Sequence, residues 1–216
     1  MRIISALEKM WIRLKINKLL KSYNKLHIGC GNQIYEDWIN IDSFTNPLLT
    51  SNEKKYIVSK KNFIKFDITE LWPFKINTIK YIYSSHLIEH LSYSNSQLFL
   101  ERCYHTLQKK GVLRITCPDL KFWVAKYLNT DYSFFNALST HGWPSNIYTS
   151  GDFLCYQFYG WDHKWMYDEN NIKYLLHKAG FNTIYRKKFN SSVIPDMKFL
   201  ESKARQFESL YIECIK

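Results

Sequence analysis

The sequence predicts an α/β fold built on a doubly wound, mostly parallel sheet, and three observations favour it. Short apolar runs typical of buried strands alternate with segments of helical periodicity. The first strand ends in two glycines, Gly29 and Gly31, and the second ends in a carboxylate, Asp42. A chain of 216 residues, 46% of them hydrophobic, can bury one good core, and it lacks Pro- or Gly-rich linkers. We therefore expect one domain, residues 25–216, after an N-terminal segment, residues 1–24.

Residues 1–24 predict a basic amphipathic helix. Seven Lys and Arg residues among the first 25 positions face a single acid, Glu8. Between them, apolar residues recur near helical spacing: Ile4, Leu7, Met10, Trp11, Leu14, Ile16, Leu19 and Leu20. Such a helix either packs its apolar stripe on the domain or docks on an anionic membrane surface. Binding to nucleic acid could also explain the net charge of +11. However, the basic residues outside this segment are scattered along the sequence rather than arranged in a stripe.

Residues 25–28 read as a buried strand that breaks into the turn Gly29-Cys30-Gly31. Glycine supplies the torsion angles of a sharp turn and lets a ligand approach without a Cβ in the way. Residues 38–42 read as the second strand. In parallel sheets ligands bind beyond the carboxyl ends of the strands, where an acid such as Asp42 typically holds ribose hydroxyls. The short spacing between the glycines and Asp42, and the missing third glycine, argue against a nicotinamide dinucleotide.

The remaining elements follow in order. Residues 43–60 are polar and poorly periodic, so we expect a loop there. A helix should follow Ser94 and stop at Gly111, and a second should begin at the cap Asp168 and end near Gly180. Five further strands are expected at residues 62–66, 78–83, 112–116, 183–186 and 210–215. After the third strand, Asp67 either caps a turn or faces a ligand.

Four motifs in this order carry a resemblance: Leu26-His27-Ile28-Gly29-Cys30-Gly31, then Asp42, then Phe66-Asp67-Ile68, then Ser84-Ser85-His86-Leu87-Ile88-Glu89-His90-Leu91. From about residue 25 onward the chain resembles class I S-adenosylmethionine-dependent methyltransferases. It is most similar to the small type 11-like enzymes found among bacterial surface-polysaccharide genes. The resemblance implies a Rossmann-like sheet of seven strands with an antiparallel last strand. It also implies S-adenosylmethionine as cofactor, bound by Gly29, Cys30, Gly31, Asp42, Asp67, Ile68, Ser85 and His86.

The reaction chemistry should lie just past the fourth strand. On a helical turn, His86, Glu89 and His90 would share one face, and their side chains are suitable ligands for Zn, Fe, Ni or Mn. Alternatively, Glu89 pairs with a basic residue and His86 contacts the cofactor. A fourth candidate ligand, His163, lies in a later loop, and the set resembles the divalent-metal site of small-RNA 2′-O-methyltransferases. Without a metal, we expect His90 or His163 to act as general base, with Asp119 as a further candidate.

These features predict an O-methyltransferase that acts on a sugar hydroxyl of a surface glycan or its precursor. The alternatives are an RNA ribose 2′-O-methyltransferase and a non-catalytic scaffold of a glycan-assembly complex. The segment 134–165 is rich in aromatic residues, and they have two interpretations. They either form the core of a subregion that covers the sheet, or they provide a surface on which a sugar ring or a nucleobase stacks. The five cysteines include no Cys-x-x-Cys pair, which favours a reducing compartment. The sequence has no apolar run of eighteen residues, so we expect no membrane span. Both points predict a cytoplasmic protein, and residues 1–24 could give it peripheral contact with the inner face of the membrane.

Overall fold

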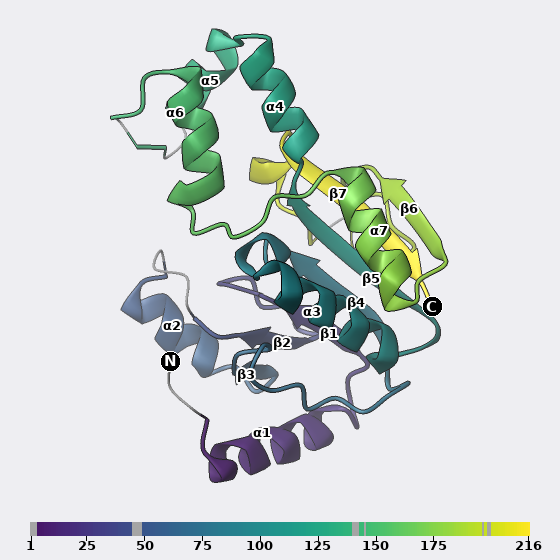
Figure 1. Ribbon diagram of the computed structural model, residues 1–216. Coiled ribbons are helices and arrows are strands. Elements are labelled where there is room, and N and C mark those ends of the chain that lie inside the picture. Colours follow the sequence, from purple (N-terminus) through teal and green to yellow (C-terminus); the bar gives the residue numbers. More distant parts are fainter. Residues whose placement is uncertain (1–3, 45–48, 140–142, 145, 196, 198–199) are drawn as a thin grey trace.

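The computed structural model describes residues 4–44, 49–139, 143–144, 146–195, 197 and 200–216. Its centre is a seven-stranded sheet in the order β3-β2-β1-β4-β5-β7-β6 (Figure 1). The strands are β1 (Lys25–Ile28), β2 (Ile39–Asp42), β3 (Phe63–Lys65), β4 (Ile79–Ser85), β5 (Leu107–Pro118), β6 (Thr183–Lys187) and β7 (Ser209–Ile215). β7 alone of these seven runs opposite to the direction of the other strands. The predicted fold class is therefore confirmed, including the antiparallel last strand.

Helices α1 (Ala6–Leu19), α3 (Tyr93–Thr106) and α7 (Glu169–Ala179) share one core with the sheet. Most residues of β1, β2 and β4 and of the second half of β5 are buried, as in parallel strands covered on both faces. Each helix presents buried residues to them, for example Ile16, Leu100 and Leu176. α7 begins and ends as predicted, because Asp168 caps its first turn and Gly180 ends it at a φ of 112°.

A second cluster of buried residues shows what covers part of the other side of the sheet. Trp38, Tyr83 and Val112 pack there against Ile194 and Met197. Among its described residues the covering segment has no α-helix or strand, so its buried backbone groups need hydrogen-bond partners from elsewhere. A fully buried cation provides them, as Arg114 on β5 donates to the carbonyls of Lys188 and Ser191. This arginine ties the last connection of the chain onto the sheet.

Between β5 and α7 the chain forms a helical cover: α4 (Leu120–Leu128), α5 (Tyr132–Ser139), α6 (Ser150–Cys155) and the π-helical turn η2 (Tyr156–Gly160). These helices stand beyond one edge of the sheet, away from α1 (Figure 1). Their interior is aromatic, with Trp123, Phe135 and Phe153 buried in a core of their own. Tyr148 and Tyr159 are exposed instead. The predicted aromatic segment therefore packs a cover and also leaves rings at its surface.

Two element predictions were wrong. The expected loop at residues 43–60 contains α2 (Ser51–Val58), which begins with a reciprocal capping box between Thr50 and Glu53. Its lysine-rich sequence buries Ile57 alone of its eight residues, so no periodicity marks it. Gly111 does not stop a helix, since α3 ends at Thr106 and Gly111 lies within β5 beside a register shift. The glycine at position 111 therefore marks the register shift between β4 and β5 and not the end of a helix. The expected turn at Asn46-Pro47 lies outside the described residues.

All five cysteines are free thiols, four of them buried and Cys155 exposed. This agrees with the expected absence of a disulfide framework. Among the described residues, none of the helices combines the length and the apolar character needed to cross a bilayer.

Acid should destabilise the fold through His27, the fully buried imidazole in β1. Its ring stacks 4.3 Å from that of Tyr35, and burial lowers its pKa from 6.5 to about 3 although Asn40 partly opposes this. A depressed histidine pKa means that the unfolded chain takes up the proton first as pH falls below 6.5. Stability should then fall by at most about 1.4 kcal/mol per pH unit down to about pH 3. Urea titrations of the wild type and of His27→Phe measure this, and equal slopes with pH would contradict it.

Candidate active site

The glycine turn is tied to the tip of β2 by its backbone. Gly29 and Gly31 have φ angles of 73° and 53°, which favour glycine. The amides of Gly29 and Cys30 both donate to the carbonyl of Ile41, at 2.9 and 3.1 Å. The carboxylate of Asp42 accepts from the amides of Gly31, at 2.8 Å, and Phe44, at 2.6 Å. A carboxylate has about four acceptor positions, so Asp42 keeps capacity for ribose hydroxyls.

The two glycines differ in what surrounds them. A Cβ on Gly29 would lie 2.9 Å from the Cβ of Leu87, whereas one on Gly31 would have no described atom within 4 Å. Gly29 is therefore needed for close packing between the tips of β1 and β4. Gly31 borders open space, as a turn approached by a ligand should.

Because of this difference, we expect substitution of Gly29 to reduce mainly stability and substitution of Gly31 to reduce mainly cofactor affinity. Gly29→Ala should destabilise the fold by more than the roughly 1–3 kcal/mol that such strained backbone alone costs, because Leu87 must also move. Gly31→Ala should cost only about 1–2 kcal/mol but weaken S-adenosylmethionine binding. Thermal unfolding and calorimetry of both variants separate the two effects. Equal unfolding losses would show that Leu87 does not constrain the turn.

The other residues predicted near the cofactor have local partners. Burial raises the pKa of the Cys30 thiol, which makes it unreactive. Asp67 accepts from the amide and the hydroxyl of Thr69, both at 2.7 Å, so it caps a turn. Ile68 is buried in the main core. For Asp67 the capping interpretation is therefore confirmed.

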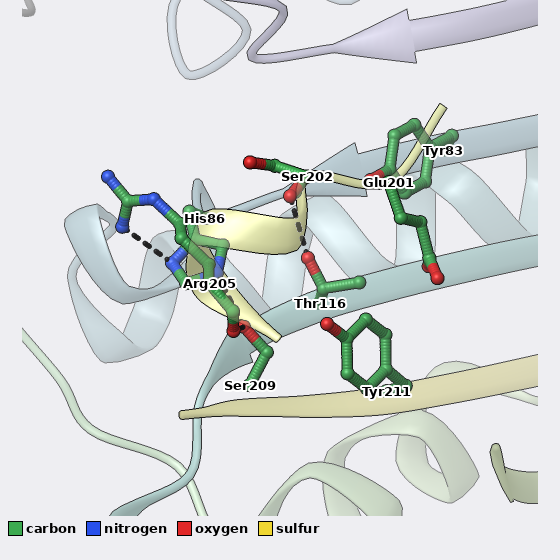
Figure 2. A pocket seen from close by; sticks show the side chains of 9 residues that line it. Tyr83, His86, Thr116, Glu201, Ser202, Arg205, Ser209 and Tyr211 are labelled. Atoms are coloured by element: carbon green, nitrogen blue, oxygen red, sulfur yellow. Dashed lines mark hydrogen bonds between the residues drawn. The ribbon is translucent and has the colours of Figure 1, made fainter. Parts of the chain in front are cut away.

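Ser85 and His86 line a pocket on the β5 and β7 side rather than the glycine turn. Figure 2 shows His86 in this pocket beside Arg205 and Ser209. The Ser85 hydroxyl lies 2.7 Å from that of Thr116. His86 lies between Arg205, 3.0 Å from its Nδ1, and Ser209, 2.9 Å from its Nε2. Both ring nitrogens of His86 therefore lie within hydrogen-bonding distance of another side chain. Cofactor contact through these two side chains is therefore not what the geometry favours.

Glu89 and His90 lie in the short 3-10 turn η1 (Ile88–His90). Two backbone hydrogen bonds bring the segment with His163 next to this turn. The carbonyl of Glu89 accepts from the amides of Lys164, at 2.7 Å, and Trp165, at 3.2 Å. The rings of His90 and His163 are 4.9 Å apart. Ligand atoms of Glu89, His90 and His163 all lie within 4.8 Å of one another. Two segments more than seventy positions apart thus form one cluster, which we call the Glu-His-His cluster.

The electrostatics of this cluster are unusual for a protein interior. Glu89 is 0% exposed, and neither carboxylate oxygen has a hydrogen-bond partner among the described residues. Burial alone would raise its pKa, but contact with His86 and the nearby His90 and His163 lower the pKa to about 2. A carboxylate buried in this way is costly unless positive charge or hydrogen-bond donors lie beside it, and the imidazoles of His86, His90 and His163 are the groups placed to supply them.

His163 is held in one tautomer. Its Nδ1 lies 2.6 Å from the carbonyl of Gln157, and because a carbonyl can only accept, that nitrogen carries the proton. Nε2 is then free to bind a metal or take a proton. Burial lowers the pKa of His163, while Glu89 partly raises it. The carbonyl comes from the π-helical turn η2, a rare conformation that often marks functional sites.

Two predicted site residues lie outside the cluster. His86 has a φ of 49° and precedes the turn, so the expected helical face does not include it, although its Nδ1 lies 3.2 Å from Glu89. Asp119 caps α4 through the amide of Lys121 and pairs with Arg186 at 3.0 Å. Both oxygens of Asp119 thus have partners, and its place is structural.

Sequence analysis missed Glu208 and Arg205. Glu208 is buried, which raises its pKa, and Arg205 lies 4.0 Å from it and also contacts His86. One signal was present in the chain. The residue before an antiparallel last strand lies at the same sheet edge as the carboxyl ends of the parallel strands.

Comparison with known proteins agrees with this geometry. Residues 26–115 match the family model of a methyltransferase domain. A SAM-dependent methyltransferase from Archaeoglobus fulgidus shares 14% identity and a TM-score of 0.54, over 96% of this chain and 94% of that one. One from Mesorhizobium loti shares 10% identity and a TM-score of 0.53, over 95% and 98% of the two chains. No curated protein matches the chain.

A further relative in fold is a phosphoethanolamine N-methyltransferase from Haemonchus contortus, in complex with phosphomonomethylethanolamine and S-adenosylhomocysteine. It shares 13% identity and a TM-score of 0.53, over 97% of this chain and 57% of that one. Such identities show a shared fold. The matched methyltransferase domain covers residues 26–115, and the solved structures show that nearly the whole chain shares the fold of S-adenosylmethionine-dependent methyltransferases.

Proposed function

We propose that the protein methylates a hydroxyl group of a sugar, in a surface glycan or its precursor. The observation that carries the proposal is the buried carboxyl group of Glu89 beside two imidazoles at the carboxyl edge of the sheet. A sugar hydroxyl is a poor nucleophile until its proton leaves, so an O-methyltransferase needs a proton acceptor. An imidazole with a fixed tautomer supplies one.

In this proposal, His163 Nε2 accepts the hydroxyl proton, and His90 is the alternative base. The negative charge of Glu89 stabilises the imidazolium that forms, and the Gln157 carbonyl keeps the ring oriented. S-adenosylmethionine held at the glycine turn and Asp42 would supply a methyl group activated by its sulfonium: the acceptor oxygen would bond to the methyl carbon, and the sulfur would keep the electron pair of the C–S bond as S-adenosylhomocysteine leaves. The protein then mainly aligns the acceptor and removes its proton.

The donor set also fits a divalent metal. Two histidines and one carboxylate are the protein ligands of many catalytic zinc and non-haem iron sites. A carbonyl that fixes the tautomer of a ligand histidine, as Gln157 does for His163, is a common second-shell feature. Glu89, His90 and His163 would hold the ion, which would lower the pKa of a bound hydroxyl. Zinc binding by calorimetry, weakened in His163→Asn, tests this without an activity assay.

The surroundings support a sugar acceptor. Trp165 is partly exposed beside the cluster and packs on Tyr93, with ring centroids 4.7 Å apart. Tyr159 on η2 is more exposed. Aromatic rings of this kind stack on the C–H faces of sugars. We place the reaction in the cytoplasm, which the five free thiols favour.

An RNA ribose 2′-O-methyltransferase is the second candidate, favoured by the Glu-His-His cluster and the net charge of +11. Labelled S-adenosylmethionine, offered with nucleotide sugars and oligosaccharides or with a short RNA duplex, separates the two. Each reaction is run with and without chelator. Transfer to sugars supports our proposal, whereas transfer to RNA alone contradicts it. A scaffold without activity would bind no S-adenosylmethionine in calorimetry.

A further inference from the structure

The N-terminal helix α1 carries two apolar faces. Ser5 and Glu8 form a reciprocal capping box that starts the helix. Ile12 and Ile16 then bury themselves in the main core. Packing on the domain, one of the two expected roles of this helix, is therefore observed, but it uses only part of the apolar residues.

The second apolar face points to solvent. Leu7, Met10, Trp11 and Leu14 are between 54% and 73% exposed. Their spacing of i, i+3, i+4 and i+7 places them in one stripe, and at about 100° per residue it lies roughly opposite Ile12 and Ile16. Exposed large apolar residues scattered singly are ordinary, whereas a contiguous stripe of four indicates a binding surface.

Positive charge borders this stripe. Arg13, Lys18 and Lys21 are exposed, and the amino group of Lys15 lies 5.1 Å from the ring centre of Trp11. Glu8 is the one acid in the helix, and its carboxylate accepts from the amide of Ser5. The stripe therefore has cationic flanks, and Glu8 is the single acidic side chain of the helix against them.

We propose that this outward face of α1 docks on an anionic lipid bilayer. The apolar stripe would enter the headgroup boundary while the basic side chains contact lipid phosphates. The cationic border argues for this partner over a second copy of the chain, because two such faces would repel each other. The inference is independent of the acceptor that the active site methylates.

Co-sedimentation with phosphatidylglycerol-containing vesicles tests the proposal on the full chain. We expect binding that phosphatidylcholine vesicles do not match and that high salt weakens. Trp11→Ser/Leu14→Ser should weaken it by about tenfold or more, since binding scales with buried apolar area. Arg13→Gln/Lys18→Gln/Lys21→Gln should weaken it by roughly 100-fold, because each basic residue contributes about 1 kcal/mol.

Matched controls address charge and folding. Lys121→Gln/Lys178→Gln/Lys188→Gln removes three exposed charges outside α1, and it should bind as the wild type does. Thermal unfolding checks that the α1 variants remain folded. Three results would overturn the proposal: no binding by the wild type, unchanged binding by the α1 variants, or a dimer that Trp11→Ser/Leu14→Ser dissociates without vesicle binding.

Discussion

Replacing Glu89 by glutamine should lower the rate of methyl transfer by about 10²- to 10⁴-fold, the usual contribution of general acid–base catalysis. The substitution keeps the size of the side chain but removes the charge that stabilises a protonated His90 or His163. S-adenosylmethionine binding should persist, because the glycine turn and Asp42 are unchanged. Single-turnover rates at saturating cofactor, with calorimetry of cofactor binding, measure both effects.

Glu101→Gln is the matched control for this change. Glu101 lies on α3, is largely exposed and contacts His105 at 3.8 Å. Its substitution should leave the rate unchanged. A Glu89→Gln variant that is folded and as active as this control would show that the Glu-His-His cluster takes no part in the reaction.

Replacing Arg114 by methionine should lower the free energy of unfolding by about 3–5 kcal/mol, the cost of breaking a buried ion pair. Arg114 is 0% exposed, and its Nε lies 2.6 Å from Glu201. Glu213 is also fully buried and lies 3.5 Å from its guanidinium. Without the arginine, both carboxylates would lose a buried cationic partner. The carbonyls of Lys188 and Ser191 would also lose a donor.

Urea denaturation of Arg114→Met measures this loss against Lys109→Met, an exposed cation in the same strand. The control should change stability by no more than about 0.5 kcal/mol. A loss in Arg114→Met as small as that of the control would mean that the arginine does not anchor the last connection to the sheet.

The sheet could be predicted because its signals are local. Each strand is a short apolar run, and the turn at Gly29 and Gly31 and the acid Asp42 mark the first two strand tips. α7 was equally clear, with a cap at Asp168 and a glycine terminator. By contrast, the partners of the buried Arg114 lie 74 to 99 positions away, so no local pattern reveals them.

The candidate site was partly predictable for the same reason. Glu89 and His90 follow a strand tip, and His163 sits in a loop that the strand order returns to that edge. His86 was grouped with them on an assumed α-helical turn, but the chain there has a positive φ and then a 3-10 turn. The apolar residues of α1 were read as one stripe, although burial divides them between two faces.

A crystal structure with S-adenosylhomocysteine and a sugar acceptor tests the central claim most directly. We expect the adenosine over the glycine turn with its ribose on Asp42, and the sulfur facing the Glu-His-His cluster. The acceptor oxygen should then lie within hydrogen-bonding reach of His163 or His90, and about 3–3.5 Å from the position of the transferred methyl. A sulfur that faces away from the cluster, or an adenosine bound elsewhere, would contradict the account.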